Sequence, residues 1–171
     1  MSEHLPPLNW GNFLEELQGI SERASAIVSG AMLEDILGHL LLNRLVDDEG
    51  VAQDLLFNAY GPLGTFSARI NMAYMLGLIG KQEQRELNLV KRIRNEFAHE
   101  TDASFNDEAI TNRCRELKLP DMFPGTTTDA RNRFHISVTS LANALGIWAL
   151  NAKHIEPHEE LDIKFRGAAD D

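Results

Sequence analysis

Apolar residues recur every three or four positions in five segments of this chain, and this spacing limits its fold more than any other feature. The spacing matches the 3.6-residue turn of an α-helix and gives each helix a side to bury. β-branched residues are scattered and never alternate over a length that would form a strand. We therefore predict an all-α fold, a single-domain helical bundle of about six to seven helices.

Turn and capping residues divide the pattern into helices. Gly61-Pro62-Leu63-Gly64 is typical of a turn, and Gly80 suits the C-terminal cap of the helix before it. The helix that starts at Thr65 is apolar on two sides, which predicts burial. The expected helices lie near 9–20, from 21 or 25 to 46, and near 51–57, 65–79, 81–99, 106–119 and 129–153.

The last expected helix carries five apolar residues at alternating spacings of four and three, which fits either a core stripe or a seam between subunits. The run covers about two heptads, fewer than the three or four of a typical seam, so the core interpretation is favoured. The five residues are Phe134, Val138, Leu141, Leu145 and Trp148. We expect residues 1–157 to form the helical domain and residues 158–171 to be a flexible, charged tail.

The net charge of -10 and the pI of about 5.0 bear on function. A duplex-binding protein neutralises phosphates with Lys and Arg, and a strongly acidic chain opposes this, so direct DNA binding is not expected. The N-terminus lacks the basic and apolar segments of a secretory signal, and no uninterrupted apolar run is long enough to span a membrane. We expect a cytoplasmic protein without a membrane segment.

Two segments resemble the mannitol operon repressor (MtlR) family. Residues 61–79 contain a Gly-Pro-Leu-Gly turn, Ser-Ala-Arg and an apolar helix that ends in Leu-Gly-Leu-Ile; residues 93–99 contain Arg-x4-His. The resemblance implies an all-α, MtlR-like domain and negative control of transcription without an evident helix-turn-helix. No basic recognition helix stands out in this chain either. We therefore expect a non-enzymatic regulator that contacts another protein, such as a transcription factor, and forms a homodimer.

Arg69 is the only charged residue of the expected helix 65–79. One interpretation is a buried cation that ties two helices together, which requires partners because an uncompensated buried charge costs several kcal/mol. Its five donors could bridge a carboxylate and helix-end carbonyls, and the candidate acids are Glu34, Asp35 and Glu96. The alternative is a binding site for an anion or a partner. A phosphate cradle after Gly64 is also conceivable, although the Gly-Lys-Ser/Thr ending of a nucleotide loop is missing.

Arg94, Asn95 and His99 form the constellation with possible chemistry. Their spacing also resembles the Arg-x4-6-His motif of HEPN-domain ribonucleases, which implies metal-independent RNA cleavage, or an inactive relative, as the alternative function. His can move a proton and Arg can stabilise phosphorane-like charge. On a regular helix Arg94 and His99 lie about 140° apart, whereas Asn95 and His99 share a face. The favoured interpretation is structural: His99 at the helix end, and Arg94 paired with Glu34 or Asp35.

No cofactor or metal is expected. His154 and His158 have the spacing of two ligands on a helix, but Pro157 lies between them and breaks a helix. Cys114, the single cysteine, is expected to be a buried small residue and excludes an intramolecular disulfide. A basic cluster on the expected helix 81–99 is expected to be a solvated face offset by nearby acids; it comprises Lys91, Arg92 and Arg94, against Glu83, Glu86 and Glu96.

Overall fold

The computed structural model describes residues 15–17, 19–58, 60–123, 125 and 129–159. Within these ranges the chain forms six α-helices, a π-helical turn (η1) and a 3-10 turn (η2), and no strand, which confirms the predicted all-α fold. In chain order they are α2 (Glu22–Leu42), α3 (Glu49–Ala52), η1 (Gln53–Phe57), α4 (Phe66–Met75), α5 (Lys81–His99), α6 (Glu108–Glu116), η2 (Leu119–Met122) and α7 (Ala130–Asn151).

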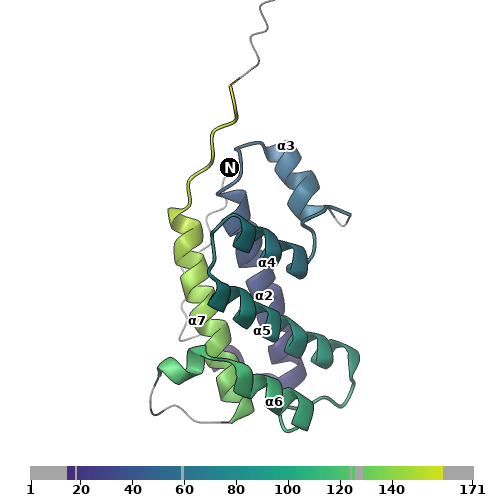
Figure 1. The fold of residues 1–171 in the computed structure, drawn as a ribbon. Helices are drawn as coiled ribbons and strands as arrows, with labels where there is room; N and C mark the ends of the chain where they lie inside the picture. Colours follow the sequence, from purple (N-terminus) through teal and green to yellow (C-terminus); the bar gives the residue numbers. More distant parts are fainter. Residues whose placement is uncertain (1–14, 18, 59, 124, 126–128, 160–171) are drawn as a thin grey trace, which may run out of the picture.

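Helix α2 runs through the middle of the bundle and contacts α4, α5 and α7, with α7 along one side (Figure 1). By length and composition alone α2 could cross a membrane, but more than half of its most apolar window is buried inside the protein. This burial identifies α2 as the core helix of the bundle. Its fully buried side chains include Leu33, Leu37 and Leu41.

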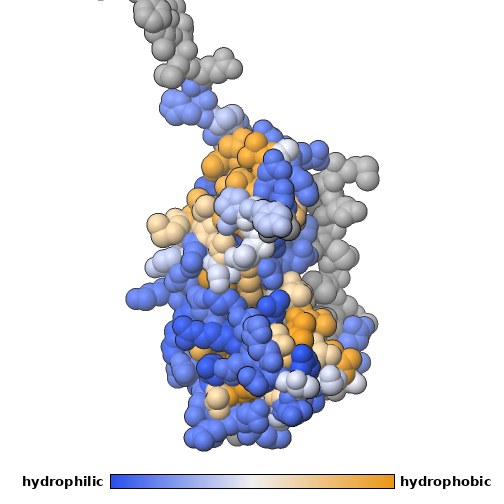
Figure 2. Space-filling model, turned by 90° about the vertical axis from the view of Figure 1, so that its right-hand side faces the viewer, coloured by the Kyte–Doolittle hydropathy of each residue, from blue (hydrophilic) through white to orange (hydrophobic). Residues whose placement is uncertain are grey.

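Helix α2 begins after Ser21, whose hydroxyl accepts a hydrogen bond from the amide of Ala24, and it ends earlier than position 46. The expected short helix at 51–57 is instead α3 followed by η1, and it starts after the capping carboxylate of Asp48. Figure 2 shows apolar side chains gathered near the top of one face, over this segment, where Val51 and Phe57 are exposed.

Helix α4 ends at Met75, four residues before the predicted end. The cause is Gly77, whose φ of +68° continues the chain in the left-handed region that glycine adopts without strain. The expectation that Gly80 caps this helix was wrong: Gly80 is the N-terminal cap of α5. Helix α5 itself has the predicted bounds, Lys81 to His99.

Helix α7 buries Phe134, Val138, Leu141 and Leu145, as the core interpretation predicts. The fifth member of the stripe, Trp148, is 37% exposed near the C-terminal end of the helix. Of the first expected helix, residues 15–17 and 19 are helical, and its part before residue 15 lies outside the described residues. Most of the expected tail, residues 160–171, also lies outside them, so the flexible tail stays a prediction.

Candidate functional site

Asn95 and His99 line one cavity of about 220 Å³ on the outer side of α5. They are four positions apart, which places them on the same face of the helix. Arg92, Glu96, Glu100 and Arg113 complete the lining. The ion pair between Glu96 and Arg113 joins α5 to α6 across this cavity and neutralises part of its charge.

Arg94 is not among the residues that line this cavity. Its Nη1 atom donates a hydrogen bond to Asn95 Oδ1 at 3.0 Å, and its buried Nε has no hydrogen-bond partner. The side-chain stem passes so close to Gly30 of α2 that a Cβ there would lie 2.6 Å from Arg94 Cγ. The expected ion pair with Glu34 or Asp35 was wrong, because the Gly30 contact and the Asn95 hydrogen bond hold the side chain.

The end of α5 is fixed by a second arginine. Arg23 of α2 donates hydrogen bonds to the backbone oxygens of Ala98 and Glu100, at 3.1 and 3.2 Å. These oxygens belong to the last turn of α5 and to its C-terminal cap, where carbonyls lack intrahelical partners. Arg23 therefore holds the exposed His99 at a defined place on the surface without contacting its side chain.

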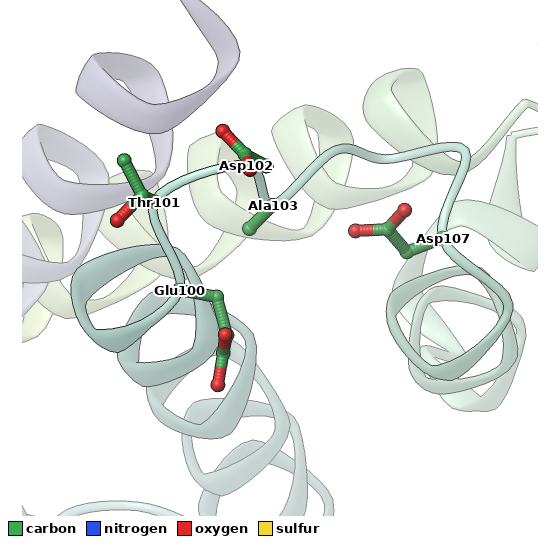
Figure 3. A pocket seen from close by; sticks show the side chains of 5 residues that line it. All are labelled: Glu100, Thr101, Asp102, Ala103 and Asp107. Carbon is green, nitrogen blue, oxygen red and sulfur yellow. The ribbon is translucent and has the colours of Figure 1, made fainter.

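A second cavity, of about 410 Å³, lies beside the first in the connection between α5 and α6 (Figure 3). Its lining carries three carboxylates, from Glu100, Asp102 and Asp107. Asp107 is already engaged, since its Oδ2 accepts a hydrogen bond from the amide of Ser104 at 2.8 Å. Across the described ranges of the chain, no group of three or more His, Cys, Asp or Glu residues is placed to hold a metal ion.

Arg69 is buried, with 7% of its surface exposed, and it donates to three backbone oxygens. Nε bonds to Leu63 at 3.0 Å, Nη1 to Glu34 at 2.8 Å and Nη2 to Leu56 at 2.6 Å. The expected acidic partners were wrong: carbonyl groups, including the backbone oxygen of Glu34, take the place of carboxylates. The fork-shaped guanidinium thus ties α4 to α2, to η1 and to the segment between η1 and α4.

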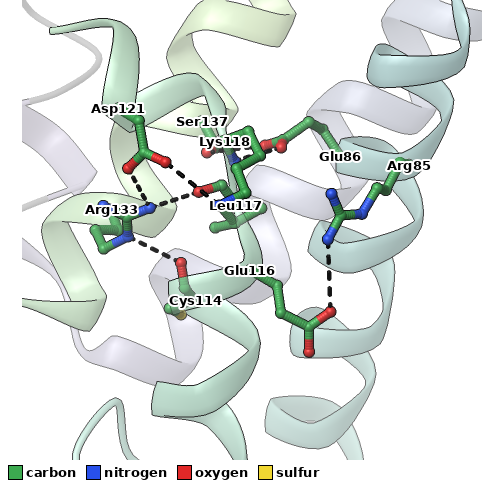
Figure 4. A network of polar contacts seen from close by, with 9 residues as sticks. All are labelled: Arg85, Glu86, Cys114, Glu116, Leu117, Lys118, Asp121, Arg133 and Ser137. Carbon is green, nitrogen blue, oxygen red and sulfur yellow. Dashed lines mark hydrogen bonds and ion pairs between the residues drawn. The ribbon is translucent and has the colours of Figure 1, made fainter.

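A polar network joins α5, α6, η2 and α7 (Figure 4). Glu86 of α5 is fully buried and accepts hydrogen bonds from the amide of Lys118 at 2.5 Å and the hydroxyl of Ser137 at 3.3 Å. Arg133 of α7 donates to the backbone oxygens of Cys114 and Leu117, and to Asp121 Oδ1 at 2.8 Å. This network fixes the connection from α6 to η2.

Our sequence interpretation missed Glu86, which we assigned to a solvated face. A signal was present: Glu86 lies four and seven positions before Val90 and Ile93, on the apolar stripe of the helix. Burial raises the pKa of this carboxyl above its ordinary value, while the hydrogen bonds oppose that effect. Cys114 is fully buried, as expected, and its burial raises the pKa of the thiol to about 12, which excludes a reactive thiolate.

Known proteins resemble this chain in sequence and in fold. The model of the mannitol repressor family (MtlR) matches residues 11–139. Two mannitol operon repressors, from Escherichia coli strain K12 and from E. coli O6:H1 strain CFT073, are each 32% identical over 116 residues. These matches cover 65% of this chain and 60% of the relatives, so the chain matches about three fifths of their length.

One solved structure has the same fold over most of the chain. It is the X-ray structure of the MtlR-HPr complex from Escherichia coli, with a TM-score of 0.65 and 23% sequence identity. The superposition covers 80% of this chain and 98% of the other. At this identity the likeness establishes the fold of the bundle and nothing finer.

Proposed function

Because this chain belongs to the mannitol repressor (MtlR) family, we propose that it is a cytoplasmic repressor of a carbohydrate operon of the mannitol type that acts through protein contacts. Direct readout of DNA is not part of the proposal. The proposed protein partner links this chain to transcription. This partner is either a transcription factor or a protein that controls one.

The observation that carries this proposal is where the cations lie. Arg23, Arg69 and Arg131 donate to backbone oxygens of other segments of the chain, and Arg85 and Arg113 pair with carboxylates. A groove-reading surface needs Lys and Arg free to meet phosphates. In a chain of net charge -10, side chains that hold helices together are not available for that purpose.

The solved neighbour supports a protein partner, since its title records a complex with HPr. We infer that this chain binds an HPr-type protein as well, and that it works as a homodimer. A ribonuclease function has less support, because Arg94 packs against Gly30 while His99 lines the cavity of α5. The chemistry of that motif requires both side chains to reach one phosphate.

Isothermal titration of the full chain with purified E. coli HPr tests the partner, and sedimentation velocity tests the dimer. We expect saturable, one-to-one binding with a Kd in about the micromolar range that is usual for transient regulatory contacts. Ubiquitin, another small soluble protein, serves as the negative control. Equal heats for HPr and ubiquitin would exclude an HPr-type partner.

Fluorescence anisotropy with duplex DNA tests direct DNA binding. The salt concentration runs from about 50 to 200 mM, because binding that depends on phosphate contacts weakens about a thousandfold or more over this range. Two kinds of duplex are compared: a pool of random sequence, and fragments from upstream of the operon that adjoins the gene for this protein. We expect weak, sequence-independent binding that vanishes at the upper salt concentration. Tight binding of one fragment by the isolated chain would overturn the proposal.

A further inference from the structure

Helix α7 carries no charged side chain over most of its length. Residues 134–152 contain no Asp, Glu, Lys or Arg, although 25% of the residues in the chain are charged. One side of α7 packs against α2, α5 and α6, and the helix lies at the edge of the bundle (Figure 1). A helix without charge on any side is typically buried all round. The outward side of α7 therefore has the composition of a covered surface.

Large apolar side chains are exposed on this outward side. Ile147 is 50% exposed and Leu150 is 63% exposed, and Trp148 beside them is exposed as well. Asn143 lies four positions before Ile147 and Leu150 lies three after it, so helical spacing places these residues on one face. The buried stripe that includes Leu145 lies on the opposite side of the helix. We call Asn143, Ile147, Trp148 and Leu150 the outer α7 face.

A second copy of this chain is the occupant that the charges favour. Two copies of net charge -10 repel each other where carboxylates meet, and the outer α7 face brings none together. A basic protein is attracted instead to acidic segments such as residues 47–54, which carry four carboxylates and no cation. Asn143 suits contact with its own copy, because an amide has both a hydrogen-bond donor and an acceptor.

We propose that two copies of this chain meet through the outer α7 face, related by a two-fold axis. A two-fold contact pairs one surface with itself, so the apolar side chains of each copy cover those of the other. Ser140 and Ala144 are small and lie on the same side of the helix, which lets the two α7 backbones approach closely. This inference rests on the homodimer proposed above and names its interface. It does not depend on an HPr-type partner.

Sedimentation velocity of the full chain, from submicromolar to several hundred micromolar concentration, tests the interface. Ile147→Glu and Leu150→Glu each place a carboxylate on the outer α7 face, and each change occurs twice in a two-fold dimer. We expect either change to weaken dimerisation about a hundredfold, as for a hot-spot substitution made in both copies. Met75→Glu is the matched control, because Met75 is exposed in the last turn of α4 as Leu150 is in α7. It should dimerise as the wild type does.

Trp148 reports on the same face by its fluorescence. The chain has two tryptophans, so Trp10→Phe leaves Trp148 as the single emitter. Its emission should shift to shorter wavelength as the dimer forms and water leaves the contact, and Leu150→Glu should abolish this shift. Circular dichroism verifies that each variant is folded.

Three outcomes would overturn the proposal, and they differ in what else they exclude. A wild type that stays monomeric at every concentration would exclude the homodimer as well, while the HPr titration would still decide the partner. Equal dimerisation of Ile147→Glu, Leu150→Glu and Met75→Glu would exclude the interface alone. A monomer whose binding to HPr is lost in Ile147→Glu would assign the outer α7 face to the protein partner instead.

Discussion

The Nε2 atom of His135 lies 2.6 Å from the hydroxyl oxygen of Ser25, where α7 packs against α2. Both side chains are buried, and the other ring nitrogen of His135 has no hydrogen-bond partner. The ring also lies near the aromatic rings of Phe105 and Phe134, with centroids at 6.3 and 6.0 Å. The most extensive helix contact of the bundle thus contains a neutral imidazole in apolar surroundings.

This arrangement predicts a loss of stability in acid. Burial lowers the pKa of His135 from 6.5 to about 4. A depressed histidine pKa means that the unfolded chain binds the proton more readily, so the stabilising contribution is full above pH 6.5 and is lost as the pH falls toward 4. We expect His135 to account for a decrease on the order of 3 kcal/mol in the free energy of unfolding.

Urea unfolding at pH 7 and pH 4.5 measures this effect, in the wild type and in His135→Gln. Gln keeps a hydrogen-bonding side chain beside Ser25 and cannot take up a proton, so the acid-induced loss should shrink. His99→Gln, at an exposed position, is the control and should retain the full loss. An identical pH dependence in the wild type and His135→Gln would show that His135 does not cause the acid-induced loss of stability.

Glu86 predicts a dependence of the opposite sign. Its pKa is raised by burial, so the folded state holds this proton more tightly than the unfolded chain does. The contribution of Glu86 to the free energy of unfolding is therefore full below pH 4.5 and is lost as the pH rises through the folded-state pKa of this carboxyl. Glu86→Gln keeps an acceptor for the Lys118 amide and removes the buried charge. We expect it to be as stable as the wild type or more stable at pH 8.

Glu86→Leu is the companion variant, because it removes the acceptor together with the charge. It leaves the Lys118 amide and the Ser137 hydroxyl without this partner and should cost about 1–3 kcal/mol. Chemical unfolding at pH 5 and pH 8 separates the two effects. A Gln variant that is less stable by the same amount at both pH values would contradict the role given to the charge.

Local sequence patterns predicted the helices and their buried sides well, but not every helix end. The spacing of Leu87, Val90, Ile93 and Phe97 predicts the helix α5, and four of the five stripe residues of α7 are buried. The end of α4 was missed because Gly77 and Gly80 are both plausible stops, and only the backbone conformation distinguishes them.

Side-chain partners were predicted less well than helices, because they depend on contacts between distant segments. Nothing near Arg69 in the sequence says that its donors meet the backbone oxygens of residues 34, 56 and 63. The Ser25–His135 contact joins positions 110 residues apart. In contrast, Asn95 and His99 lie on one helix, so their common cavity follows from helical spacing alone.

Arg69→Met should be severely destabilising. Met keeps much of the buried volume but leaves three carbonyl groups without their donor, which costs about 3–5 kcal/mol in a site of this burial. Amide hydrogen exchange should accelerate first between η1 and α4, the segment that Arg69 ties to α2. Arg44→Met is the control, since its one hydrogen bond to Lys153 is exposed. Equal losses in the two variants would refute the role of Arg69.

His99→Ala should leave growth and RNA integrity unchanged when it is expressed beside the wild type. The reason is that Arg94, the second group of the nuclease motif, is held by Gly30 and Asn95 and is not in the cavity of His99. Incubation of both purified proteins with labelled single-stranded RNA measures cleavage directly. Toxicity or cleavage that disappears in His99→Ala would favour the ribonuclease function instead.

Gly30 and Gly146 give a matched pair of helix glycines with opposite predictions. Alanine at 146 meets nothing within 4 Å and should stabilise α7 by about 0.5–1 kcal/mol, because alanine is the better helix former. Alanine at 30 would place its Cβ 2.6 Å from Arg94 Cγ, and the arginine stem must move. We expect Gly30→Ala to destabilise by about 1–3 kcal/mol, the usual cost of overpacking.

Thermal and urea unfolding of both variants compare these two glycines, and NMR of the Asn95 side chain follows the hydrogen bond from Arg94. Gly30→Ala should shift the Asn95 amide signals, whereas Gly146→Ala should leave them in place. Because Asn95 also lines the outer cavity of α5, the same shift reports on the shape of that cavity. A Gly30→Ala protein as stable as Gly146→Ala, with unchanged Asn95 signals, would mean that Arg94 does not depend on the close approach of α2 and α5.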